Sequence, residues 1–366
     1  MNHPLLPCLL RTWFLVLAVG WAGGCASNKV AGPKGPTFFP PAPDEPHVQF
    51  LLAFSSEADF GKKSSFMEHI TGLPFTANPL YKPYGLAMQE GLLYVCDTAR
   101  GAIEVFDFAK KRTRMFVPAY EGSTFVPFNI AIDLDGTRYV TDTGNTGSGS
   151  PKVGIYAQDD SYVDRLTLAK DMRPVDVALG PDRIYVSDMK GHCVRVYNKA
   201  DRKPLFTIPR DLKAGPGWLY QPANLALDPQ GRVLVSDLGG SQVCVYDLEG
   251  NYLRTLGRPG RGPGMFARPK GVAVDREGRA YVVDAATEAV QLFDRDGRLL
   301  MYFGRPNPGR PKPGDLLLPA AVKVDYESLP LFEKWVAPNF KAEYLIFVTS
   351  QFGSDKVSVY AFGSKK

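Results

Sequence analysis

The amino-acid sequence predicts an all-β protein in which six similar four-stranded sheets are arranged in a ring. One pattern recurs: a proline, two residues, an apolar strand, a turn, the motif Tyr-Val-x-Asp, and a strand that ends in an aromatic residue. Successive prolines of the pattern lie 44 to 50 residues apart, a spacing that accommodates one four-stranded sheet. The 36 glycines and 31 prolines are spread along the chain and indicate many turns between short strands.

The repeats can be followed through the chain from their prolines. They begin, in order, at Pro83, Pro127, Pro174, Pro222, Pro269 and Pro319. In the first five, the motif or a close variant ends at Asp97, Asp142, Asp188, Asp237 and Asp284, whereas the sixth ends at Ser350. We interpret the five aspartates as structural acceptors that hold turn amides, because Asp side chains readily bond nearby backbone N–H groups.

The two ends of the repeat region complete each other. Only six residues follow Tyr360, so the sixth repeat ends after its third strand. One spare strand, residues 48–54, precedes the first repeat. An open array would leave an exposed sheet edge, and pairing the spare strand with the last sheet closes the ring. The predicted fold is therefore a six-bladed β-propeller closed by an N-terminal strand on the last blade.

The repeats resemble those of the NHL family of β-propellers, whose units carry Pro-x-Gly-[IV]-Ala-[VI]-Asp followed by Tyr-Val-x-Asp. The best copy is Pro-Lys-Gly-Val-Ala-Val-Asp at residues 269–275, and the resemblance covers residues 80–361. It implies the six-bladed fold. It implies no particular activity, because propellers host many functions.

The first 25 residues resemble the signal of a bacterial lipoprotein. Arg11 precedes an apolar run at residues 13–21, which is too short to span a bilayer comfortably and is typical of a secretory signal. Small residues then lead to Cys25, as in a lipobox, and this resemblance implies that Cys25 is diacylated and becomes the N-terminus. Ala26 after the cysteine implies sorting to the outer membrane. The alternative is cleavage by the ordinary signal peptidase, which would leave a soluble periplasmic protein.

This organisation predicts three parts. Residues 1–24 form the signal peptide, residues 25–46 a Pro/Gly-rich tether, and residues 47–363 the NHL-type propeller. The expected location is the cell envelope, at the outer membrane or in the periplasm. The lipid on Cys25 would anchor the protein to the membrane.

Two insertions interrupt the rhythm of the repeats. Residues 55–80 separate the spare strand from the first repeat, with a short helix expected around residues 64–70. Residues 326–343 lie between the first two strands of the sixth repeat. Insertions on a rigid scaffold often meet partners, although they can also be simple decoration.

One face of the predicted ring gathers the candidate binding residues. The first strand of each blade begins beside the central channel, so the third residue of each repeat lines the channel mouth. Its occupants are Gly85, Asn129, Asp176, Asn224, Gly271 and Ala321. We expect the contact surface to be this mouth, with Tyr84, Phe128, Asn129, Asp176, Asn224, Lys270 and the Gly-rich loop 143–150.

Three consecutive blades place Asn129, Asp176 and Asn224 where the family prefers glycine. Oxygen ligands that converge on one axis suit a hard divalent cation such as calcium. The arrangement resembles that of gluconolactonase-like propellers, which hold a divalent metal with Asn, Asp and Glu at the starts of inner strands. In those enzymes the Asn or Asp directly precedes the glycine, so the ligands here are shifted by one residue, and no matching Glu is evident. The alternative is that the three side chains bind channel water or cap strand ends.

Several classes of function lack support in the sequence. The net charge is +5 without a dense Lys/Arg block interleaved with aromatics, which argues against nucleic-acid binding. His47, His69 and His192 follow the leader, and none begins an inner strand. This differs from the lyase-type NHL propellers that hold zinc with three histidines. No Gly-x-Ser-x-Gly elbow of a serine hydrolase follows a strand.

The sequence thus predicts a membrane-tethered, monomeric propeller that serves as a binding or scaffold module for a protein or small ligand. No catalytic residue is assigned. The alternative is a metal-dependent hydrolase or lactonase that acts at the same channel mouth.

Overall fold

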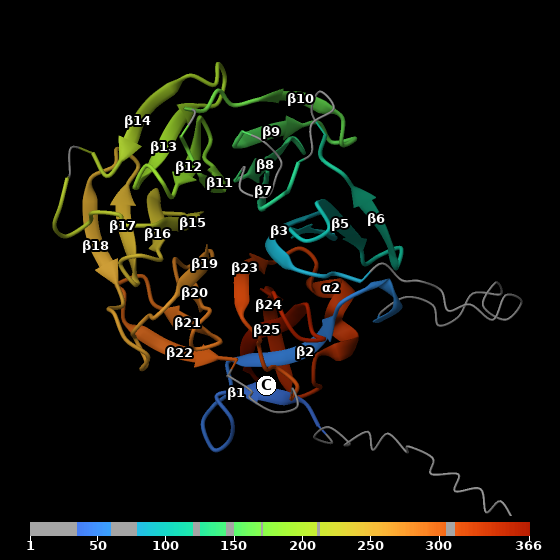
Figure 1. The fold of residues 1–366 in the computed structure, drawn as a ribbon. Coiled ribbons are helices and arrows are strands. Elements are labelled where there is room, and N and C mark those ends of the chain that lie inside the picture. The colour runs from blue at the N-terminus through green and yellow to red at the C-terminus, as the bar shows by residue number, and fades with distance from the viewer. Residues whose placement is uncertain are drawn as a thin grey trace, which may run out of the picture. The chain divides into compact units, whose positions relative to one another are not determined.

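Six antiparallel sheets follow one another around a central axis (Figure 1). The computed structural model describes residues 35–59, 79–119, 125–143, 150–169, 171–210, 213–304 and 312–366, which belong to the unit Gly35–Lys366. The predicted signal peptide, Cys25 and the helix expected at residues 64–70 lie outside the described residues. Within the described ranges, no helix is long and apolar enough to cross a membrane.

The first three repeats each form one four-stranded blade, in chain order. Blade one contains β3 (Pro83–Gln89), β4 (Leu92–Asp97), β5 (Ala102–Asp107) and β6 (Arg112–Phe116). Blade two contains β7 (Asn129–Ile132), β8 (Arg138–Asp142), β9 (Lys152–Tyr156) and β10 (Tyr162–Arg165). Blade three contains β11 (Pro174–Leu179), β12 (Arg183–Asp188), β13 (Cys193–Asn198) and β14 (Pro204–Ile208).

The next two blades repeat this plan, and the sixth modifies it. Blade four contains β15 (Pro222–Leu227), β16 (Arg232–Asp237), β17 (Gln242–Asp247) and β18 (Tyr252–Leu256). Blade five contains β19 (Pro269–Val274), β20 (Ala280–Asp284), β21 (Ala289–Phe293) and β22 (Leu299–Phe303). Blade six contains β23 (Pro319–Asp325), β24 (Phe340–Ser350) and β25 (Val357–Lys365), joined by β2 (Val48–Phe54) and β1 (Thr37–Phe39).

The predicted closure by the N-terminal strand is confirmed. Strand β2 pairs antiparallel with β25, from Val48 opposite Phe362 to Phe54 opposite Val357. Strand β1 then adds a fifth strand by pairing with β2. The stretch expected as a tether therefore includes three residues of regular strand. A single sheet thus contains both ends of the described chain, and this sheet joins blade five to blade one.

The first strands β3, β7, β11, β15, β19 and β23 lie nearest the centre of the ring (Figure 1). Each packs against the first strand of the next blade, and β23 packs against β3. We call the end of the channel at which these strands begin the proline end, after the motif prolines of the six repeats.

The repeated aspartates hold the segment that leads into each blade. The carboxylate of Asp97 accepts hydrogen bonds from Tyr81 N at 2.6 Å and Lys82 N at 3.0 Å, both just ahead of β3. Equivalent bonds to amides ahead of the first strand are made by Asp142, Asp188, Asp237 and Asp284. The interpretation of these residues as structural acceptors is confirmed.

A hydroxyl group joins neighbouring blades beside the channel. Ser187 accepts a hydrogen bond from Asp176 N of its own blade at 2.9 Å and donates to the carbonyl of Ala223 in blade four at 2.6 Å. The same donation to the next blade is made by Thr141 to Val175 at 3.0 Å and by Thr349 to Tyr84 at 2.7 Å. These hydroxyls satisfy a buried N–H and a buried C=O that would otherwise lack partners.

Glycine replaces the hydroxyl at two of the six joints. Blades one and five have Cys96 and Val283 at the hydroxyl position, and each has glycine at the third repeat position. Gly85 N bonds directly to the Phe128 carbonyl of blade two at 3.0 Å. A Cβ built on Gly271 would lie 2.5 Å from the Cα of Ala321, so only glycine allows this approach of β19 to β23.

The apolar core of the described propeller is divided among the spaces between blades. Each hydrophobic cluster combines residues of two neighbouring blades. At the closing joint, Phe54 of β2 packs edge-to-face on Phe106 of blade one, with ring centroids 5.0 Å apart. Burial of apolar surface therefore stabilises the joints, and the stability of a blade depends on its neighbours.

The insertion in blade six folds back onto the ring. It carries α2 (Leu329–Phe332) and the 3₁₀-helix η2 (Glu333–Trp335). Phe332 is buried in the closing cluster. The side-chain amide of Gln49 on β2 donates to Trp335 O at 2.9 Å and accepts from Ala337 N at 3.0 Å. The insertion thus covers the closing strand, a structural role that leaves its contact with partners untested.

The closing joint gives a direct test of the hydroxyl bridge. Thr349→Val keeps the shape of the side chain but leaves Ala321 N and the Tyr84 carbonyl without their buried partner. We expect the free energy of unfolding to fall by about 1–3 kcal/mol, as measured by urea denaturation. Thr207→Val, at an exposed position of β14, serves as the matched control and should change stability little. Equal losses for both variants would contradict the bridge.

Candidate functional site

A cavity of about 250 Å³ runs along the channel. All six first strands line it with residues of the third to sixth repeat positions, from Asn129, Asp176 and Asn224 to Met88, Leu227 and Val324. Third-position residues are buried, whereas the sixth-position residues are half-buried in every blade. Solvent exposure of the inner strands therefore increases away from the proline end.

The three candidate ligand residues all line this cavity, but most of their oxygens already accept hydrogen bonds from the protein. Asp176 Oδ1 accepts from Val177 N at 2.8 Å, and its Oδ2 accepts from Leu225 N at 2.8 Å and from Asn224 Nδ2 at 3.3 Å. Asn129 Oδ1 accepts from Ile130 N at 3.0 Å. These bonds match the alternative in which the side chains cap the strand starts.

Two features of the same group remain open to a ligand. Asn224 Oδ1 is buried and has no hydrogen-bond partner among the described residues, and a buried carbonyl oxygen of this kind normally has one. Burial raises the pKa of Asp176 to about 6, although hydrogen bonds from Leu225 N and Val177 N oppose the shift. A proton, a water molecule or a donor group of a ligand would complete this polar layer.

The structure adds Lys323, a residue that the sequence analysis did not select. It occupies the fifth repeat position, where the other blades carry Ala87, Ala131, Ala178, Ala226 and Ala273. Lys323 is exposed within the channel, and partial desolvation by the protein atoms that surround it there lowers its pKa. The break in the alanine series was the available sequence signal.

Tyr84, Phe128 and Lys270 meet at the proline end although they come from blades one, two and five. The rings of Tyr84 and Phe128 lie with centroids 4.0 Å apart. Lys270 Nζ lies 5.2 Å from the centroid of the Tyr84 ring and donates to Gln351 Oε1 at 3.2 Å. Gln351, in the loop after β24, was also missed because the sixth repeat is degenerate there.

Burial shapes the chemistry of this cluster. Lys270 is 5% exposed and Tyr84 is 6% exposed. Desolvation, with the positive charges of Arg268 and Lys82, lowers the pKa of Lys270 to about 8. Desolvation, with the charge of Asp176, raises the pKa of Tyr84. The cluster therefore holds a poorly solvated ammonium against an aromatic pair.

The Gly-rich loop 143–150, which was also predicted to belong to the mouth, is described only at its two ends. Thr143 and Ser150 begin and end the Gly-rich loop, and Thr143 is buried while Ser150 is exposed. Residues 144–149 lie outside the described residues. The described structure therefore brings together all six singled-out mouth residues in two layers, a polar one along the cavity and an aromatic–cationic one at the proline end.

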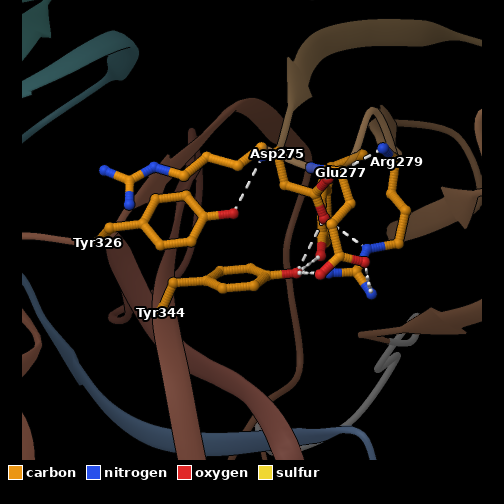
Figure 2. Close-up of polar contacts among 7 residues, drawn as sticks. Asp275, Glu277, Arg279, Tyr326 and Tyr344 are labelled. Carbon is orange, nitrogen blue, oxygen red and sulfur yellow. Dashed lines mark hydrogen bonds and ion pairs between the residues drawn. The ribbon is translucent and has the colours of Figure 1, made fainter. Parts of the chain in front are cut away.

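A second polar cluster joins blades five and six, as Figure 2 shows. Tyr344 OH donates to Asp275 Oδ2 at 3.0 Å, and Arg279 Nε donates to the same oxygen at 2.6 Å. Tyr326 OH accepts from Arg276 N at 3.0 Å. Because Asp275 already receives several donors and is buried, this cluster fastens the two blades and offers no open acid or base.

Comparisons with known proteins agree on the architecture. A family profile described as "6-bladed beta-propeller" matches residues 221–302. No curated protein is similar enough in sequence to be matched to this chain.

Solved structures show similar folds at low sequence identity. A structural genomics protein of unknown function from Bacteroides thetaiotaomicron has a TM-score of 0.60 at 14% identity, covering 86% of this chain and 75% of that one. A gluconolactonase from Xanthomonas campestris has a TM-score of 0.55 at 16% identity, covering 90% and 96% of the two chains. A virginiamycin B lyase from Staphylococcus aureus has a TM-score of 0.54 at 14% identity, covering 79% and 98%. At such identities the likeness shows the fold alone: the chain is a six-bladed β-propeller.

Proposed function

We propose that the chain is a lipid-anchored, NHL-type propeller that acts as a binding module for a protein or small ligand in the cell envelope. The observation that carries the proposal is the buried ammonium of Lys270 at the proline end, held against Tyr84 and Gln351. Within the described residues it forms no ion pair with a carboxylate. A buried charge without a partner is unfavourable for folding, and such groups concentrate at functional sites.

The alternative, a metal-dependent hydrolase or lactonase, draws on the likeness of fold to a gluconolactonase. Asn129, Asp176 and Asn224 would be the ligands of one divalent cation such as calcium. The donor set fits such an ion poorly, because both Asp176 oxygens already accept protein hydrogen bonds and Lys323 adds positive charge to the same cavity. In the part of the chain that is described, no group of three His, Cys, Asp or Glu side chains could hold a metal.

Metal analysis separates the two functions. We expect the purified protein, equilibrated with calcium or zinc and then desalted, to hold much less than one equivalent of metal and to hydrolyse gluconolactone no faster than buffer. One equivalent of metal together with lactone hydrolysis, both lost in Asp176→Ala and retained in the control Asp182→Ala at an exposed position, would establish the enzyme instead.

The unfavourable burial of the Lys270 charge can be measured through its effect on the free energy of unfolding. Its pKa falls from 10.5 to about 8 on folding, so the protein gains stability from this lysine as pH rises from 8 to 10.5. At pH 7, Lys270→Met should increase the free energy of unfolding by up to about 3 kcal/mol, and the increase should shrink at pH 10. Urea denaturation at both pH values, with Lys341→Met at an exposed position as control, measures it. A pH-independent loss of stability would contradict this reading.

The anchor has its own test. In bacterial cells, radiolabelled palmitate should enter the wild-type chain and Cys8→Ala, but it should not enter Cys25→Ala. Label retained in Cys25→Ala, or absent from the wild type, would contradict the lipoprotein assignment.

A further inference from the structure

Three cationic side chains lie at the proline end, and none of them forms an ion pair with a carboxylate among the described residues. Lys82 and Arg268 occupy the same repeat position, directly before the motif prolines of blades one and five, and both are exposed. Lys270 lies beneath them in the strand that Arg268 leads into. The charges of Arg268 and Lys82 both act on Lys270 and disfavour its protonated form. All three therefore contribute to one positive region.

The nearest repeated aspartates form no ion pair with these three side chains among the described residues. Asp97 accepts from Lys82 N, and Asp284 accepts from Arg268 N at 3.2 Å, so their oxygens hold the backbone. Across the described residues, no ion pair joins a carboxylate to the side chains of Lys82, Arg268 or Lys270. The aspartates thus fix the backbone from which the side chains of Lys82 and Arg268 extend.

Lys270 also has unused hydrogen-bonding capacity. An ammonium has three donors, and among the described residues it makes one bond, to Gln351 Oε1 at 3.2 Å. The Tyr84 ring at 5.2 Å offers an attractive π face but no formal charge. Lys356 contacts the same loop, donating to Gln351 O at 3.0 Å and Tyr81 O at 2.7 Å, so it adds positive charge and no acceptor.

We propose that the proline end is an anion site in which Lys270, Arg268 and Lys82 bind a phosphate or carboxylate group. The inference rests on the proposed binding function and names the chemistry of its ligand. An anionic oxygen can accept from the Lys270 ammonium while Arg268 forms a planar, two-pronged contact, which phosphate and carboxylate groups both match. The exposed pair admits the ligand, and the half-buried Phe128 ring, which lies tilted against Tyr84, offers an apolar surface for its attached group.

Isothermal titration calorimetry of the full-length protein with inorganic phosphate and with citrate, at low salt and pH 7, tests the site. We expect saturable binding that weakens at least tenfold in Lys270→Met and in Arg268→Gln. Arg298→Gln, an exposed arginine on the outer hairpin of blade five, should bind as the wild type does. Affinity should also fall as pH rises above about 8, where Lys270 loses its proton.

Vesicles distinguish a soluble ligand from a lipid headgroup. Cys25→Ala, which lacks the anchor, is mixed with phosphatidylglycerol vesicles and with neutral phosphatidylcholine vesicles. Binding to the anionic vesicles that phosphate displaces and Arg268→Gln removes would identify a headgroup site; binding of phosphate or citrate without vesicle binding would identify a soluble ligand. Both results support the anion site.

Two results would overturn it. One is the absence of saturable binding to phosphate, citrate and anionic vesicles. The other is binding that Lys270→Met and Arg268→Gln leave unchanged. The metal and lactone measurements distinguish failure of the anion site from failure of the binding-module proposal, because their outcome does not depend on Lys270 or Arg268.

Discussion

The joint between neighbouring first strands is the constraint on which the whole ring depends. Six strands surround a narrow channel, and each must approach the next closely without leaving a buried N–H or C=O unpaired. At five of the six joints the chain satisfies this in one of two ways. Blades two, three and six use a Thr or Ser hydroxyl that accepts from one blade and donates to the next, as Ser187 does. Blades one and five use glycine, as at Gly85.

The hydroxyl and the glycine are complementary choices at linked positions. Where the third repeat residue carries a Cβ, the second strand supplies a hydroxyl, and where it is glycine, the second strand supplies Cys96 or Val283. The cavity-lining side chains Asn129, Asp176 and Asn224 all belong to blades of the hydroxyl type. In each of these blades the hydroxyl of Thr141, Ser187 or Ser236 accepts a hydrogen bond from the third-position N–H.

Much of the fold could be predicted from the sequence because it depends on local repetition. The proline spacing predicted the number of blades, and the spare strand Val48–Phe54 ahead of the first repeat predicted the closure. The repeated aspartates bind amides close to them in their own blade, so their role was also accessible. Strand β1 was missed because three residues between prolines show no usable periodicity.

The site was only partly accessible, because it depends on how distant blades meet. The third-position rule placed Asn129, Asp176 and Asn224 on the channel correctly. It could not show that Lys270 reaches from blade five to Tyr84 of blade one, or that burial sets the pKa of these groups. Lys323 could have been found in the sequence, because it interrupts a series of alanines at the fifth repeat position. Gln351 could not, because the motif of the sixth repeat is degenerate and only the structure shows where this residue lies.

Hydrogen–deuterium exchange of residues 48–54 tests ring closure most directly. If β2 completes blade six, its amides paired with β25 exchange as slowly as those of β24 and open only with the whole ring. Rapid exchange in β2 while β24 and β25 stay protected would mean that the N-terminal strand does not close the ring, and the account of the joints and of the proline end would be contradicted.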